Sequence, residues 1–155
     1  VAAPLVGIVF GAYDLYTQSQ QPKPGVDVST RPVMGDWAIL REISEAASDL
    51  DAAREMLLGN LIEMYEYACA DEPIPTELRQ RCRRDQIMAG VRALRATDKV
   101  LEHAGGRGLS SKSPLQRMWR DAHGARAHVV NSPNMTLAAY AMGELGGVNF
   151  DMMGS

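Results

Sequence analysis

The chain has 155 residues, enough for one domain with a sizeable hydrophobic core. Its 16 Lys and Arg and 19 Asp and Glu give a net charge of −3, so the charge balance does not indicate binding to nucleic acid or to an anionic membrane surface. No apolar run approaches the ~18 residues of a membrane span, and no basic segment precedes the apolar residues 1–11, so we expect neither a span nor a signal peptide. Cys69 and Cys82 are interpreted as small buried residues of a reduced, cytoplasmic protein.

The first predicted element is a helix over residues 4–19. Its apolar residues are spaced by three or four positions, as one buried helix face requires. They are Leu5, Ile8, Ala12 and Leu15. Residues 20–34 contain prolines and a glycine that exclude a regular helix or a central strand, so this segment, which includes Lys23, is predicted to be a surface loop.

Residues 36–70 form the longest predicted helix, with a heptad-like apolar seam. A seam of about 35 residues would make a rod roughly 50 Å long, which favours a long antiparallel bundle. The predicted seam is Leu40, Ile43, Ala47, Leu50, Leu57, Leu61, Met64 and Ala68. Prolines in residues 71–75 end this helix and start the next, predicted over residues 76–104. Its inward positions are predicted to be Leu78, Cys82, Ala89, Leu94 and Leu101. Its arginines, Arg79, Arg81, Arg83 and Arg84, are expected to pair with acids of the helix before it.

Three glycines in residues 105–111 predict that this segment is not helical. It can be a helix end with a turn, or a loop whose backbone approaches a ligand, and the residues leave both open. A further helix is predicted from Ser113, a good N-cap followed by proline, to Asn131. Its apolar stripe is Leu115, Trp119, Ala122 and Ala125, and Arg117 could pair with Asp121. A short helix over residues 135–145 and a flexible tail follow. Together these elements predict an all-α fold: an antiparallel up-down four-helix bundle with a short extra C-terminal helix.

The histidines do not form a recognisable metal or hydrolase motif. His123 and His128 are five residues apart, about 140° around a helix, so they do not share a face as a metal pair would. No Cys or acid cluster adds further metal ligands, and no Ser-His-Asp or Cys-His pattern supports hydrolysis. From the residues alone, His128 is a structural histidine by default.

A family resemblance gives His128 a second interpretation. Arg120-Asp121-Ala122, between a helix and a following short helix, resembles the last helices of the acyl-CoA dehydrogenase fold. Dehydrogenases of that family typically carry their catalytic glutamate eight residues after this aspartate, where this chain has Val129. The pattern of residues 116–128, QRMWRDAHGARAH, instead resembles the oxygenase components of two-component aromatic hydroxylases, which include hydroxylases of phenolic seco-steroids.

This resemblance implies that residues 1–155 are a helical C-terminal domain, without the N-terminal helical and β domains of the parent family. It implies a monooxygenase that takes FMNH2 from a separate reductase, with FAD as the alternative, and that hydroxylates an aromatic substrate with O2 through a C4a-hydroperoxyflavin. His128 would be catalytic, because an imidazole can accept the proton of a phenol. The resemblance places flavin contacts at Lys23, Gly106, Arg107, His128 and Val129, requires no metal, and implies a homotetramer.

Two other functions remain open at this point. One is an acyl-CoA dehydrogenase or nitroalkane oxidase, against which the missing carboxylate at Val129 argues. The other is a non-catalytic helical module that serves oligomerisation. On the monooxygenase interpretation this chain carries only part of the site, and we expect it to be inactive alone.

Overall fold

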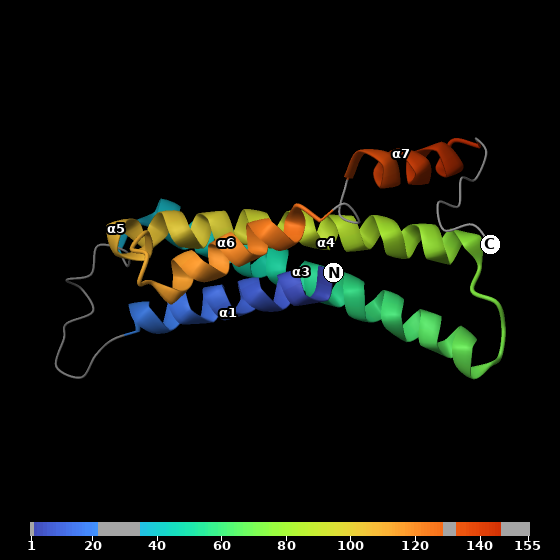
Figure 1. The fold of residues 1–155 in the computed structure, drawn as a ribbon, viewed down its shortest axis with the longest axis horizontal. Coiled ribbons are helices and arrows are strands. Elements are labelled where there is room, and N and C mark those ends of the chain that lie inside the picture. The colour runs from blue at the N-terminus through green and yellow to red at the C-terminus, as the bar shows by residue number, and fades with distance from the viewer. Residues whose placement is uncertain (1, 22–34, 129–132, 147–155) are drawn as a thin grey trace.

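The computed structural model describes residues 2–21, 35–128 and 133–146 (Figure 1). These residues form helices and no strand, which confirms the all-α prediction. The helices are α1 (Ala2–Gln20), α3 (Trp37–Cys69), α4 (Thr76–His103), α5 (Gly105–Gly108), α6 (Pro114–Arg126) and α7 (Pro133–Glu144). None of the helices in these ranges is both long enough and apolar enough to cross a membrane.

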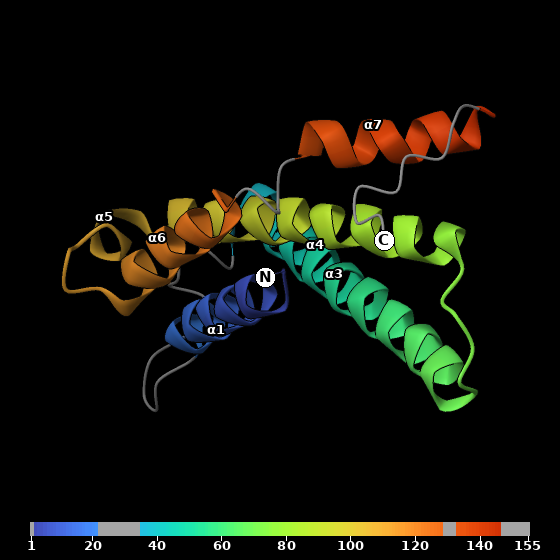
Figure 2. The ribbon, with the colours of Figure 1, turned by 45° about the vertical axis from the view of Figure 1, so that its right-hand side comes forward.

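The two longest helices, α3 and α4, form an antiparallel hairpin that organises the rest (Figures 1 and 2). Helices α1 and α6 pack on the half of the hairpin that lies near α5, and they also contact each other. Helix α7 contacts α4 over its other half. Toward this second half α3 and α4 diverge, and the far part of α3 has α4 as its main neighbour (Figure 2).

The hydrophobic core lies where α1, α3, α4 and α6 meet. Small side chains on α4 let its neighbours approach closely, and larger side chains of α1 and α3 fill the space between them. The buried members are Leu5, Val6, Val9, Ala46, Leu50, Ala53, Ala89, Ala93, Ala96 and Ala122. A second buried cluster lies nearer to α5 and consists of Ala12, Tyr16, Val100, Leu101 and Leu115. All predicted inward positions of α1, α4 and α6 are confirmed as buried or half-buried.

The predicted seam of α3 is only partly correct. Its first half is buried at Leu50, but Leu61 is 59% exposed and the buried position nearby is the polar Asn60. The reason is tertiary: α1 and α6 do not extend along this part of the hairpin, so among the described residues one face of α3 has no helix to pack against.

Polar contacts fix the register of α3 against α4. Asp49 accepts from Arg92 at 2.9 Å, and the buried carboxylate of Asp85 accepts from the amide of Asn60 at 2.9 Å. The predicted pairing of α4 arginines with α3 acids is met by Arg81, which binds Glu63. Arg84 of the predicted group instead pairs with Asp85 of its own helix, and it lies over the Tyr140 ring of α7 at 4.4 Å from its centroid.

Several local predictions are wrong. Residues 105–108 form one helical turn, because Gly105 adopts φ +60° and lets a new turn start directly after α4. Helix α6 ends at Arg126 rather than at Asn131, although its start is as predicted, with Ser113 as N-cap and proline in the first turn. No ion pair forms between the exposed Arg117 and Asp121 in the described part of the chain. The two cysteines are free, as predicted, but Cys69 is exposed and Cys82 is half-buried.

Candidate functional site

The candidate site lies at the C-terminal end of α6, which carries His128. Leu115 and Ala122 face the core, while Arg117, Arg120 and Asp121 are exposed on the outer face of the helix. After Arg126 the chain makes a tight turn: the Ala127 N–H donates to the carbonyls of His123 and Gly124 at 3.1 and 3.2 Å. The His128 N–H donates to the Ala125 carbonyl at 3.4 Å. The backbone of His128 is thus hydrogen-bonded to the last turn of α6, and His128 is exposed.

A three-residue cluster joins this half of α6 to α4. One oxygen of Asp98, Oδ1, accepts from the Trp119 indole Nε1–H at 2.7 Å and lies 2.9 Å from His123 Nε2. The two rings, one helical turn apart, contact each other with centroids 4.4 Å apart. The residue pattern indicates His123 only as a possible metal ligand, and it does not indicate Asp98. The i,i+4 spacing of Trp119 and His123 could have indicated their contact, but no sequence signal indicates Asp98.

A second contact docks the end of α6 on α4. Gly90 of α4 is buried, and a Cβ added there would lie 3.8 Å from Cδ of Arg126. The aliphatic stem of Arg126 therefore packs against the backbone of α4 at a glycine. With the Asp98 cluster, this contact holds the segment just before His128 against α4.

The glycine-rich turn of α5 is the other predicted flavin contact. Gly105 and Gly106 are exposed, and a Cβ added to either would meet no atom within 4 Å. Gly108 is buried, and a Cβ there would lie only 2.6 Å from Cβ of Ala104. Arg107 is exposed, and within the described ranges its guanidinium makes no ion pair. An open glycine backbone beside an unpaired guanidinium suits a phosphate or another anionic group.

The structure does not bring all of the predicted residues together. Gly106 and Arg107 precede α6 and His128 follows it. The 13 residues of α6 rise by about 20 Å, so the two groups lie at opposite ends of this helix (Figure 1). They would contact different parts of one extended cofactor, or two separate cofactors. Lys23 and Val129 lie outside the described residues, so their predicted roles stay predictions.

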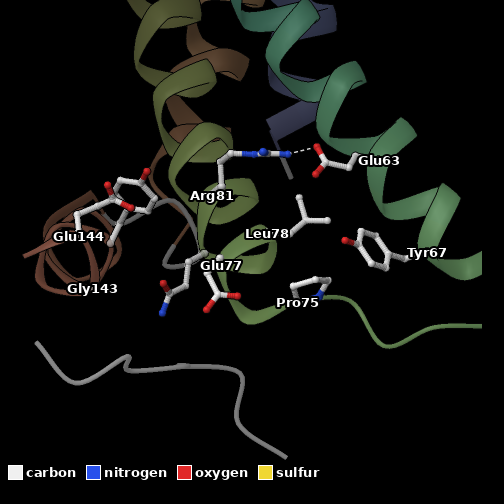
Figure 3. A pocket seen from close by; sticks show the side chains of 10 residues that line it. Glu63, Tyr67, Pro75, Glu77, Leu78, Arg81, Gly143 and Glu144 are labelled. Carbon is white, nitrogen blue, oxygen red and sulfur yellow. Dashed lines mark hydrogen bonds and ion pairs between the residues drawn. The ribbon is translucent and has the colours of Figure 1, made fainter. Parts of the chain in front are cut away.

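A separate hollow of about 500 Å³ lies between the far parts of α3 and α4 and helix α7. Figure 3 shows Arg81 directed to Glu63, with Tyr67 and Leu78 nearby. The hollow is also lined by two further glutamates, Glu77 and Glu144, and by Tyr140. Among the predicted site residues that the structure describes, Gly106, Arg107 and His128, none lines this hollow. The described residues also contain no group of three or more His, Cys, Asp or Glu side chains that could hold a metal ion.

The groups whose pKa is raised by burial lie away from the C-terminal end of α6. Burial raises the pKa of Tyr16, and burial together with the nearby Asp51 and Asp14 carboxylates raises the pKa of Tyr13. Burial also raises the pKa of the Cys82 thiol, although Arg81 acts in the opposite direction. A thiol with a raised pKa is a poor nucleophile, so Cys82 is a packing residue rather than a reactive one.

Comparison with known proteins identifies the family. Residues 1–133 match the family described as acyl-CoA dehydrogenase, C-terminal domain. A flavin-dependent monooxygenase, oxygenase subunit HsaA, of Rhodococcus jostii is 40% identical over 146 residues, which are 94% of this chain and 38% of that protein. An FADH2-dependent resorcinol hydroxylase, oxygenase component, of Rhizobium is 33% identical over 91 residues, 56% of this chain and 22% of that protein.

A solved structure shows the same arrangement of helices. The crystal structure of the 3-HSA hydroxylase from Rhodococcus sp. RHA1 matches with a TM-score of 0.86 at 40% identity, and the match covers 99% of this chain and 38% of that one. The chain thus spans well under half the length of the relatives it matches. It belongs to the acyl-CoA dehydrogenase C-terminal domain family.

Proposed function

We propose that this chain is the C-terminal helical domain of the oxygenase component of a two-component flavin monooxygenase. The proposed reaction is hydroxylation of an aromatic, phenolic compound, with steroid-derived phenols as one candidate class. The observation that carries the proposal is 40% identity to an oxygenase subunit over 94% of the chain, including the segment that presents His128. Because the relatives are much longer, the activity proposed is that of a protein containing this domain.

His128 is the proposed catalytic residue. It is exposed directly after α6, and its backbone is held by the last turn of that helix. A neutral imidazole there would accept the phenol proton and make the ring more nucleophilic. The dehydrogenase alternative requires a carboxylate base, and the position where that family typically carries it is Val129.

Gly106 and Arg107 are the proposed flavin contacts among the described residues, and Lys23, His128 and Val129 complete the proposed set. The open backbone at Gly106 and the unpaired Arg107 guanidinium fit an anionic cofactor. A bound reduced flavin would supply activation of O2, and the protein would orient the substrate and exclude water. We propose FMNH2, with FADH2 as the alternative, and the name of the resorcinol hydroxylase supports that alternative.

A separate flavin reductase is the proposed partner, since the names of the relatives describe an oxygenase subunit or component. A homotetramer is also proposed. An exposed apolar stripe on the far part of α3 supports self-association, because its members recur at helical spacing on one face. The stripe consists of Leu58, Leu61, Ile62 and Tyr65, exposed by 45, 59, 59 and 68%. An oligomerisation module is therefore compatible with catalysis rather than an alternative to it. We place the protein in the cytoplasm, where free cysteines stay reduced.

The test is anaerobic binding of FMNH2 and FADH2 to the longest form of the protein that contains this chain, followed by O2 and a phenolic substrate. We expect wild type to bind reduced flavin and form hydroxylated product. The His128→Ala variant should bind reduced flavin and lose hydroxylation by about 100-fold or more. Arg117→Ala, on the exposed face of the same helix, is the matched control and should behave as wild type. Absence of reduced-flavin binding by the wild type, or reduction of bound FAD by an acyl-CoA, would overturn the proposal.

A further inference from the structure

We propose that Asp98 is a positioning residue that sets the place of His128 by holding the C-terminal half of α6 on α4. This inference rests on the proposed function, because it assigns His128 the catalytic role. Asp98 lies on α4, and no sequence pattern links it to His128. It becomes a neighbour of α6 because α6 packs on α4.

The geometry of the cluster restrains α6 in two ways. Asp98 Oδ1 is shared by the Trp119 indole N–H at 2.7 Å and by His123 Nε2 at 2.9 Å. Because these two rings stand one turn apart on α6, holding both fixes the rotation of the helix about its axis as well as its height along α4. Their own contact, at 4.4 Å between centroids, makes the pair act as one unit.

A continuous chain of backbone hydrogen bonds carries this restraint to His128. The carbonyl of His123 accepts from the Ala127 N–H at 3.1 Å, and the carbonyl of Ala125 accepts from the His128 N–H at 3.4 Å. A rotation of α6 at His123 would therefore displace His128 with it. The stem of Arg126 against Gly90 adds packing on the same side.

The cluster differs from an ordinary surface ion pair. On the next residue of α4, Lys99 pairs with Glu45 of α3, and the two carboxyl side chains are similarly exposed, 53% at Asp98 and 46% at Glu45. Glu45, however, pairs with two long and flexible side chains, those of Lys99 and Arg41. Asp98 restrains two stiff rings next to the candidate site. A misplacement of about 1 Å can cost as much as 100-fold in rate. Loss of Asp98 should therefore lower the hydroxylation rate more strongly than it lowers the free energy of unfolding.

The experiment compares Asp98→Ala, Asp98→Asn and Glu45→Ala in the longest form of the protein that contains this chain. The readouts are reduced-flavin affinity, hydroxylated product and H2O2 formed per flavin oxidised. We expect Asp98→Ala to keep flavin affinity and to lose product by about 10-fold to 100-fold, with H2O2 formed instead. Asp98→Asn keeps an oxygen acceptor at the same place and should retain most of the product. Glu45→Ala should behave as wild type.

A second measurement reports on the cluster without flavin. In a Trp37→Phe background Trp119 is the one tryptophan left in these 155 residues, and the emission difference between Asp98→Ala and its parent should be a shift to longer wavelength. Hydrogen exchange of the amides of residues 124–128 should also become faster in that variant. Unchanged emission and exchange would overturn the proposed restraint, and so would a global loss of structure in both Asp98 variants.

The outcomes separate this inference from the proposed function. Normal product yield in Asp98→Ala, despite altered emission and exchange, would refute the positioning role while leaving the monooxygenase function intact. An Asp98→Asn variant as impaired as Asp98→Ala would show that the charge matters rather than the acceptor, and would also overturn the inference. A wild type that binds no reduced flavin and forms no product would refute the proposed function, and the catalytic part of this inference with it.

Discussion

The α5 turn contains three glycines, and replacing each of them singly by alanine should change the free energy of unfolding in three different ways. Gly108 is buried, and an added Cβ would lie 2.6 Å from Cβ of Ala104, which sits at the end of α4. Gly105 has φ +60° and open space around it, whereas Gly106 has neither a left-handed backbone nor a neighbour within 4 Å. The series separates steric overlap, backbone strain and the ordinary preference of alanine for helix.

The expected changes in the free energy of unfolding follow from these surroundings. Two carbon atoms at 2.6 Å are about 1 Å closer than their optimum, so Gly108→Ala must displace α5 or Ala104 and should cost about 1–3 kcal/mol. Gly105→Ala forces an L-residue into the left-handed region and should cost about 1–2 kcal/mol. Gly106→Ala restricts the unfolded chain without a clash and should be neutral or stabilising by about 0.4–1 kcal/mol.

Urea unfolding followed by circular dichroism measures the three differences, and reduced-flavin affinity measured on the same variants reports on the site. We expect Gly106→Ala to be the most stable of the three. We also expect Gly108→Ala to lower flavin affinity, through displacement of α5 and the attached Arg107. Equal stability of Gly106→Ala and Gly108→Ala would refute the account of the turn. If Gly108→Ala is destabilised but binds reduced flavin with wild-type affinity, α5 is not part of the flavin site.

Three further predictions concern buried or paired groups. The buried Tyr16 hydroxyl has no hydrogen-bond partner among the described residues, so Tyr16→Phe should be neutral or stabilising at pH 7. Burial raises the Tyr16 pKa above 10.0, so the neutral hydroxyl contributes stability below pH 10 and this contribution is lost as the pH rises further. In an alkaline denaturation series, Tyr16→Phe should therefore lose less stability than wild type. The hydrogen bond from Lys99 lowers the pKa of Glu45, so this pair stabilises the fold above the ordinary pKa of 4.5 and the contribution is lost as the pH falls below it. Glu45→Gln should therefore show a shallower loss of stability than wild type between about pH 5 and 3, and an identical acid profile would contradict this. Asp85→Ala leaves the buried Asn60 amide without its acceptor and should cost about 1–3 kcal/mol in urea unfolding, whereas Asp85→Asn, the control, should cost less.

The helical elements could be predicted from local signals, and their ends less well. Proline and glycine placed the breaks around residues 71–75 and after Ala104, and periodic apolar residues identified the buried faces at Leu5, Leu50 and Leu101. The helical turn of α5 was missed, because Gly105 ends one helix and allows the next to start at once. The early end of α6 was missed as well, since residues up to Asn131 carry no strong breaker.

Apolar periodicity and helix-breaking residues were enough to predict the all-α class, and residues 116–128 were enough to predict the family to which this chain belongs. The sequence also indicated His128 as a candidate, because a histidine stands beside the position where a dehydrogenase carboxylate would be expected. Which half of α3 is buried follows from the packing of the helices, since burial depends on how far α1 and α6 extend along the hairpin. This packing alone brought Asp98 to Trp119 and His123, because residues more than twenty positions apart meet only when α6 packs on α4.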